Sequence, residues 1–141
     1  MNAIDFLMKE HTRVRTMLKD ISDDSHHFAT KRKNFNVLAQ ELLRHETMEH
    51  EIWYPHFRDR LPDTVKHLLT EEKVAEIEIK KLDALKTQEA WEEYFLKFKK
   101  DVDHHAQEEK RELFPEVRKL LTASQLEDIG HELYQFKKMH S

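Results

Sequence analysis

The chain has 141 residues, of which 37% are charged and only one is a glycine, and this composition is typical of long helices with few turns. Its formal net charge of −4 is spread over mixed acidic and basic residues without a basic block, which argues against nucleic acid as a partner. The absence of cysteine excludes disulfides, thiolate metal sites and an iron–sulfur cluster held by the chain itself.

Five amphipathic segments follow one another along the chain, each with apolar residues at helical spacing. They span about residues 3–21, 30–60, 63–86, 89–121 and 124–138. Thr30 and Thr87 are the expected N-caps of the second and fourth segments. Because the connections are short, neighbouring helices should run antiparallel. We therefore expect an all-α fold with a single domain over 1–141, an up-down-up-down four-helix bundle with a short additional C-terminal helix.

Histidine is unusually frequent, with 11 residues in the chain, and two histidines open a repeated motif. The stretches "HETMEHEIWYP" (45–55) and "HAQEEKRELFP" (105–115) share His, three residues, Glu, five residues and Pro. On a helix, side chains at i and i+4 lie on the same face, one turn apart. Each stretch therefore presents one imidazole and one carboxylate together, and the repeat suggests a pseudo-twofold arrangement of the second and fourth helices.

The apolar face of each of the four long segments is interrupted midway by histidine or glutamate, which are common metal ligands. These residues are His11, His45, Glu49, Glu72, His105 and Glu109. Burying an unpaired carboxylate is costly, so polar groups at one level of four helices indicate a bound cation. Six such groups can hold two metal ions with glutamates bridging them. Imidazole and carboxylate without thiolate suit iron, manganese or zinc.

Each position also has an ordinary structural explanation. A lone histidine on an apolar face, such as His11, is more often a hydrogen-bonded core residue than a ligand. A single His-x3-Glu pair is common on charged helices, although two pairs at equal spacing favour a site. Glu72 could instead lie at the edge of its apolar face with Glu76 turned inward, and Glu46 could reach a metal from beside His45.

The other residues near the motifs have less specific expected roles. His56 could orient a ligand from further along the second helix. His50 and His104 are expected to face solvent. Pro55 and Pro115 each remove a backbone hydrogen bond and should kink the helix just past the site.

The order of these motifs resembles the hemerythrin-like (HHE cation-binding) domain, from the first helix to about Leu121. The features that match are an early histidine, a His-x3-Glu pair before "IWYP", a ligand on the third helix and a second pair before "ELFP". The resemblance implies a four-helix bundle around a non-heme di-iron centre. It assigns iron ligation to His11, His45, Glu49, His105 and Glu109.

The third helix departs from the family pattern. The family usually has a histidine there, in a stretch like "EHAAAK", where this chain reads "TEEKVAEIE" and places Glu72. A glutamate at this place leaves three histidines and three carboxylates. The added negative charge favours ferric iron, weakens the case for reversible oxygen carriage and leaves open whether one or two metals bind.

A ferritin-like di-iron bundle is the nearest competitor in fold. Its signature is a Glu-x-x-His motif on two helices. No glutamate of this chain stands three residues before a histidine, which argues against that fold family.

The expected function is that of a di-iron protein that binds, senses or reacts with oxygen, nitric oxide or peroxide, rather than a dedicated enzyme. One alternative is an iron- or zinc-binding sensor or store without redox chemistry. Another is a metal-free structural bundle whose polar layer is hydrogen-bonded. No apolar run approaches the roughly 18 residues of a membrane span, and the N-terminus does not resemble a signal peptide. We therefore expect a cytoplasmic protein without a membrane partner, and the sequence indicates no particular protein partner.

Overall fold

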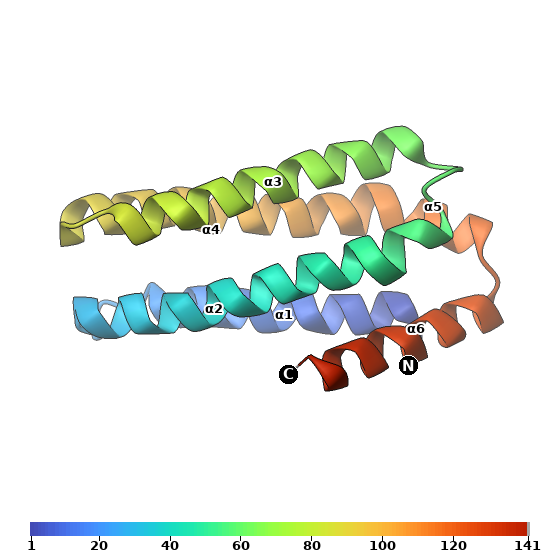
Figure 1. Cartoon of the computed structure of the whole chain (residues 1–141), viewed down its shortest axis with the longest axis horizontal. Coiled ribbons are helices and arrows are strands. Elements are labelled where there is room, and N and C mark those ends of the chain that lie inside the picture. The colour runs from blue at the N-terminus through green and yellow to red at the C-terminus, as the bar shows by residue number, and fades with distance from the viewer. Residues whose placement is uncertain (141) are drawn as a thin grey trace.

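Four long helices form a bundle in the computed structural model, which describes residues 1–140 (Figure 1). The elements are α1 (Ala3–Ile21), α2 (Phe28–Met48), η1 (Glu49–Trp53), η2 (Tyr54–His56), α3 (Pro62–Ala84), α4 (Gln88–Glu108), η3 (Glu109–Leu113), α5 (Phe114–Leu120) and α6 (Ala123–Met139). Helices α1 to α4 alternate in direction along the long axis, and α6 packs beside them at one end. Residues 1–140 contain no strand, so the all-α bundle predicted from the sequence is confirmed.

Some helices begin at a residue whose side chain caps the first turn, and others do not. The hydroxyl of Thr87 accepts a hydrogen bond from the backbone N–H of Ala90 at 3.3 Å, so this predicted cap of α4 is confirmed. The predicted cap at Thr30 is wrong, because α2 already begins at Phe28 with His27 in the N-cap position. Phe28 packs partly buried against an apolar cluster of the bundle, which favours a helix start before Thr30.

The second and fourth segments change helix type midway, just before Pro55 and Pro115, where the sequence predicted a kink. Helix α2 gives way to the π-helical turn η1 and the 3₁₀ turn η2, and α4 gives way to the π-helical turn η3 before α5. Pro55 and Pro115 lie just past the two π-turns. Proline has no N–H and its ring clashes with the carbonyl four residues earlier, so a locally wider turn accommodates it.

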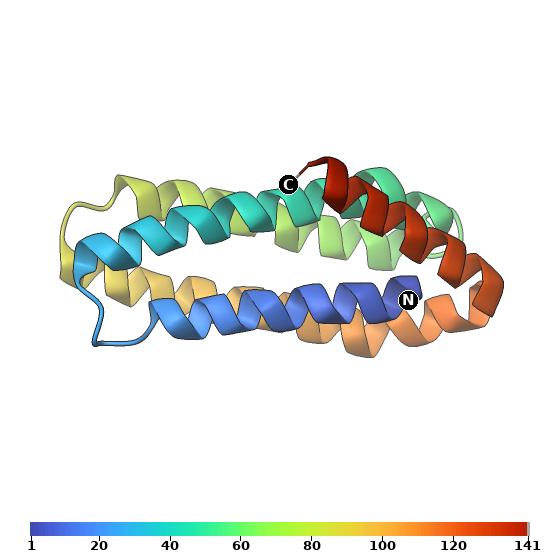
Figure 2. The same cartoon turned by 90° about the horizontal axis from the view of Figure 1, so that it is seen from below.

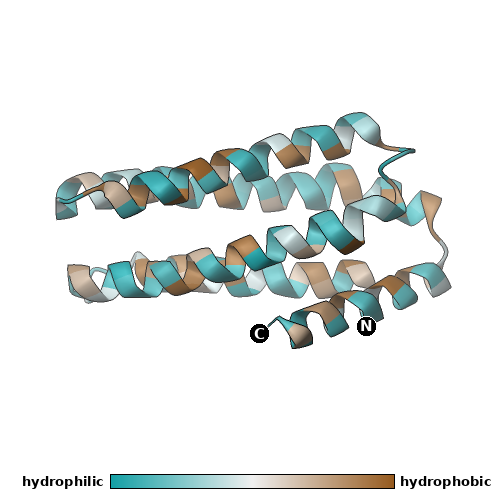
Figure 3. Ribbon diagram, viewed as in Figure 1, coloured by the Kyte–Doolittle hydropathy of each residue, from teal (hydrophilic) through white to brown (hydrophobic). Residues whose placement is uncertain are grey.

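Two apolar clusters fill the two ends of the bundle. Near the loops that join α1 to α2 and α3 to α4, the cluster includes Leu38, Trp91 and Phe98. Near the other end, Leu7 and Trp53 belong to a larger cluster that α5 and α6 help to enclose. Apolar and polar residues alternate around each long helix (Figure 3). The polar residues of the predicted site lie between the two clusters, so the fold leaves a polar layer inside an otherwise apolar interior.

Helix α6 covers the end of the bundle where the chain begins (Figure 2). Ile129 and Leu133 of α6 are buried in the larger apolar cluster. Gly130 allows a close approach, since a Cβ atom there would lie 2.3 Å from the carbonyl oxygen of Met1. Of the helices in the described residues, none is long and apolar enough to cross a membrane.

Candidate metal centre

Side chains from α3, α4 and the two π-turns meet in the polar layer. Glu49, Glu72, His105 and Glu109 each offer a ligand atom, and these atoms all lie within 4.8 Å of one another. The exposed fraction of Glu49 and of Glu109 is 0%, and that of Glu72 is 2%. Three carboxylates and an imidazole are thus concentrated in a small volume shielded from solvent.

The other two predicted residues border this group of four. Nε2 of His11 lies 3.5 Å from Oε2 of Glu109, and Nε2 of His45 lies 3.1 Å from Oε1 of Glu49. The ring centroids of His11 and His45 are 5.5 Å apart. The structure therefore brings all six predicted residues into one layer, with each of these two histidines beside a different central glutamate.

The two central carboxylates approach histidines without forming hydrogen bonds. Among residues 1–140, neither oxygen of Glu49 and neither oxygen of Glu109 has a hydrogen-bond partner. Yet Nε2 of His105 lies only 3.0 Å from Oε1 of Glu109. Donor and acceptor atoms that are close but misaligned are typical of ligands directed at a common centre. Because an unpaired buried carboxylate is costly and a cation offsets that cost, the donor set fits a metal.

The electrostatics of the layer reflect this crowding. Burial raises the pKa of Glu49 well above its usual value, and the charge of Glu109 raises it further. Burial disfavours the charged form of His45, yet the neighbouring Glu49 raises the pKa of His45 well above its usual value. Burial likewise opposes ionisation of Glu109, but His105 and His11 hold the pKa of Glu109 well below its usual value. Protons therefore occupy part of the layer, and a cation would replace them.

Three further residues, Glu71, His50 and Tyr54, hold members of the layer in place, and a fourth, Glu10, lies near His45; the sequence did not assign this role to any of them. Nδ1 of His105 donates to Oε1 of Glu71 at 3.0 Å, and Nδ1 of His45 lies 4.0 Å from Oε1 of Glu10. Glu72 contacts Nε2 of His50 at 2.6 Å and accepts a hydrogen bond from the hydroxyl of Tyr54.

These contacts correct one expectation and suggest a sequence signal. The expectation that His50 faces solvent is wrong, because the half-buried ring reaches Glu72. Glu10, His50 and Glu71 are each directly next to a predicted ligand in the sequence. Adjacent residues on a helix point about 100° apart. A polar residue next to a ligand can therefore contact, at the edge of the site, a ligand that belongs to the neighbouring helix. A polar residue directly next to a predicted ligand was therefore the sequence feature that could have indicated these contacts.

Two other sequence hypotheses are not supported by the geometry. Glu46 is buried but lies outside the group of four. Burial, with the nearby carboxylates, raises the pKa of Glu46 to about 9, so this side chain is neutral. The hypothesis that His56 orients a ligand is wrong, because its ring is directed toward Glu132 on α6, with Nε2 3.9 Å from a carboxylate oxygen.

The repeated sequence frame also produces the same backbone feature twice. The N–H of Tyr54 bonds to the carbonyl of Glu49, and the N–H of Phe114 bonds to the carbonyl of Glu109, five residues back in each case. Each π-turn therefore begins at the glutamate of a His-x3-Glu pair. Single π-turns inside α-helices are frequent at functional sites.

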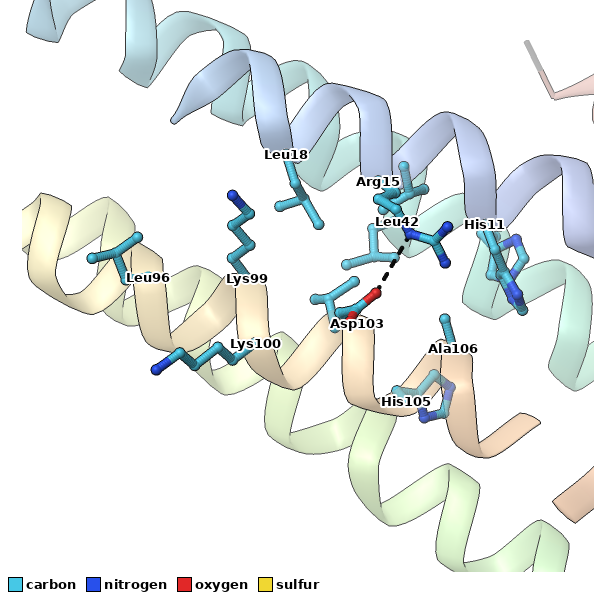
Figure 4. Close-up of a pocket in the computed structure, with 13 residues that line it drawn as sticks. His11, Arg15, Leu18, Leu42, Leu96, Lys99, Lys100, Asp103, His105 and Ala106 are labelled. Atoms are coloured by element: carbon cyan, nitrogen blue, oxygen red, sulfur yellow. Dashed lines mark ion pairs between the residues drawn. The ribbon is translucent and has the colours of Figure 1, made fainter. Parts of the chain in front are cut away.

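A pocket of about 400 Å³ connects the surface to the layer (Figure 4). It reaches His11, His45 and His105. Its apolar wall is formed by Val14, Leu18, Leu42, Leu96, Val102 and Ala106. Arg15 and Asp103 form an ion pair at its side, with Nε 3.5 Å from the carboxylate oxygen. A small molecule can approach the three histidines through this pocket.

A bundle of this topology, with imidazoles and carboxylates gathered inside it, belongs to the class of helical metal-binding proteins. The hemerythrin HHE cation binding domain matches residues 2–117, and the chain belongs to this family. The crystal structure of a hemerythrin HHE cation binding domain-containing protein from Mycobacterium kansasii superposes with a TM-score of 0.87. The two share 22% sequence identity over 99% of this chain and 87% of the other, which shows a common fold. Among curated proteins, none matches this chain significantly.

Proposed function

We propose that this protein holds two iron ions in the polar layer and uses them to bind, sense or react with oxygen, nitric oxide or peroxide. The observation that supports the proposal best is that the buried carboxylate oxygens of Glu49 and Glu109 accept no hydrogen bond within residues 1–140, in a layer that the pocket reaches. The residues that would hold the ions are His11, His45, Glu49, Glu72, His105 and Glu109. The two ions would share the central carboxylates, and zinc or manganese could substitute for iron.

The surrounding residues prepare the layer for this role. Bound ferrous iron would supply electrons and an open coordination position for a small ligand. Glu71 fixes the orientation of the His105 ring through its Nδ1 atom, and Tyr54 and His50 fix the carboxylate of Glu72. Such outer partners set both the direction and the basicity of the groups that face a metal.

The pocket is large enough for a diatomic molecule or a peroxide. Its wall is mostly apolar, and Arg15, Lys99, Lys100 and Asp103 are the charged residues that line it. It ends at three histidines that come from α1, α2 and α4. A ligand that enters by this route therefore arrives at the imidazole side of the layer, while Glu72 lies on α3.

Glu72 bears on which chemistry is favoured. It adds a third carboxylate to a layer that already contains two, with all three nearly or fully buried. Negative charge in a low-dielectric interior stabilises the more highly charged ferric state. This supports reaction or sensing over reversible oxygen carriage.

The proposal is tested by adding each ligand separately to the reduced, iron-loaded protein. Oxygen, nitric oxide and hydrogen peroxide are mixed with it under anaerobic handling, and the visible and near-ultraviolet spectrum is followed. We expect a new absorption band with at least one of them. The His131→Ala variant, altered at an exposed position of α6, should behave like the wild type. An iron-loaded protein that responds to none of the three would overturn the proposed reactivity, and a protein that takes up no iron would overturn the whole proposal.

A further inference from the structure

A second group of histidines and glutamates lies on the surface of α3 and α4. His67 and Glu71 on α3, and His104 and Glu108 on α4, repeat the His-x3-Glu spacing of the buried pairs. The side-chain exposure of His67 is 61% and that of His104 is 65%, so both rings are open to solvent. Since α3 and α4 pack against each other, the two pairs face one another across the groove between these helices.

Both histidines approach the same two carboxylates, Glu71 and Glu108. Nε2 of His67 lies 2.9 Å from Oε2 of Glu108, and Nε2 of His104 lies 3.0 Å from Oε1 of the same carboxylate. Oε2 of Glu71 lies 3.8 Å from the first ring nitrogen and 3.7 Å from the second. Ligand atoms of His67, Glu71 and Glu108 all lie within 4.8 Å of one another.

The nitrogen–oxygen separations around His67, Glu71 and Glu108 are close to those of a zinc site, and His104 borders these three residues. Zinc binds imidazole nitrogen and carboxylate oxygen at about 2.0–2.2 Å, so neighbouring ligand atoms stand roughly 3.3–3.5 Å apart. The four nitrogen–oxygen distances of 2.9, 3.0, 3.7 and 3.8 Å bracket that separation. Exposed ion pairs contribute little to stability, so stability alone gives weak reason for two histidines and two glutamates to gather here.

We infer that His67, Glu71 and Glu108 form a second metal site on the surface of the bundle, with His104 beside them as a fourth ligand, and that this site takes zinc or a similar divalent transition metal. Two imidazoles and two carboxylates are ligands that zinc accepts readily. The site is separate from the buried layer and is open to solvent on the side of the two rings. It does not depend on whether the buried layer holds iron.

One carboxylate connects the surface site to the buried layer. Oε1 of Glu71 accepts the hydrogen bond from Nδ1 of His105, while its Oε2 faces the two surface histidines. A metal held by Oε2 would fix the position of this carboxylate and hence the orientation of the His105 ring. If the proposed iron centre exists, surface metal therefore tunes it through Glu71. This coupling rests on the proposed function, whereas the surface site does not.

The test counts zinc ions per chain after equilibrium dialysis of the metal-free protein against a low excess of zinc chloride. The variants are the surface double variant His67→Ala/His104→Ala and a control with two other exposed histidines removed, His27→Ala/His131→Ala. We expect the surface variant to bind one zinc ion fewer than both the wild type and the control. Equal zinc content in all three would overturn the surface site.

A variant of the buried layer distinguishes failure of the surface site from failure of the proposed function. His45→Ala/Glu49→Ala should lose zinc from the layer and retain the surface ion, so the two losses are independent. If the layer binds no metal, the wild type should bind one zinc ion, at the surface site, and the surface variant should bind none.

The coupling is tested on the iron-loaded protein. Zinc should shift its absorption spectrum in the wild type and leave the spectrum of His67→Ala/His104→Ala unchanged. A wild-type protein that gains one surface zinc without a spectral shift would overturn the coupling.

Discussion

Replacing Glu49 by methionine should stabilise the metal-free protein and weaken its metal binding. Glu49 is fully buried, and neither of its carboxylate oxygens has a hydrogen-bond partner in the described part of the chain. An unpaired buried polar group costs about 1–3 kcal/mol. Methionine has a similar length and no polar atom to satisfy. His45 lies 3.1 Å from Glu49; although the two are not aligned as a hydrogen bond, losing this contact subtracts about 1 kcal/mol from the gain.

The net gain in the free energy of unfolding is therefore about 0–2 kcal/mol for the metal-free form. For a chain of this length, that corresponds to a rise in Tm of up to roughly 8 °C. Metal reverses the order, because the wild type binds it with the full set of ligands and gains stability from the binding. The variant should melt above the wild type in chelator and below it after loading with ferrous iron.

Thermal unfolding followed by circular dichroism measures both conditions. The matched control is Glu51→Met, an exposed position on the same π-turn, which should change neither Tm nor metal content. If Glu49→Met melts below the wild type in chelator and gains as much from iron as the wild type does, the carboxylate is satisfied by the fold. The argument for a cation in the layer would then be wrong.

Three further predictions concern the site and the packing around it. His105→Ala should lower iron content and Tm together, whereas His131→Ala should change neither, as judged by metal analysis and calorimetry. Tyr54→Phe removes a hydrogen bond to the carboxylate on α3 and should weaken metal affinity about 10–100-fold in a competition titration with a chelator. Gly130→Ala should lower the free energy of unfolding by about 1–3 kcal/mol in urea, because its Cβ would lie 2.3 Å from the carbonyl oxygen of Met1.

Each of these predictions has an outcome that contradicts it. Full iron content in His105→Ala would remove this residue from the proposed ligands. Unchanged affinity in Tyr54→Phe would mean that the carboxylate on α3 needs no support from the phenol. A stabilised Gly130→Ala protein would mean that α6 moves away from α1 easily, so that the gain of about 1 kcal/mol in helix propensity exceeds the cost of the clash.

The helices could be predicted from sequence because each carries an apolar face that only a bundle buries. Leu38 and Phe98 are fully buried, as the helical spacing of their neighbours indicates. The π-turns at Glu49 and Glu109 could not be predicted in the same way. A proline signals that a helix must adjust, but the surrounding packing decides between a kink, a break and a wider turn.

The layer could be predicted because its residues lie on the apolar faces of four helices at the same depth. The contacts that Glu71 and His50 make with ligands could not be predicted, because they depend on how the neighbouring helix is placed relative to their own. Helical periodicity places a residue on a face of its own helix only. The apolar face left open whether Glu72 or Glu76 points inward, and the exposed fraction of 2% shows that Glu72 does.

The most direct test of the central claim is the iron content per chain after anaerobic reconstitution with ferrous iron and removal of loosely bound metal. The account predicts close to two iron ions per chain in the wild type, with a new near-ultraviolet absorption band on admitting air. A chain that retains no iron, or a His45→Ala/His105→Ala variant that retains as much as the wild type, would contradict it.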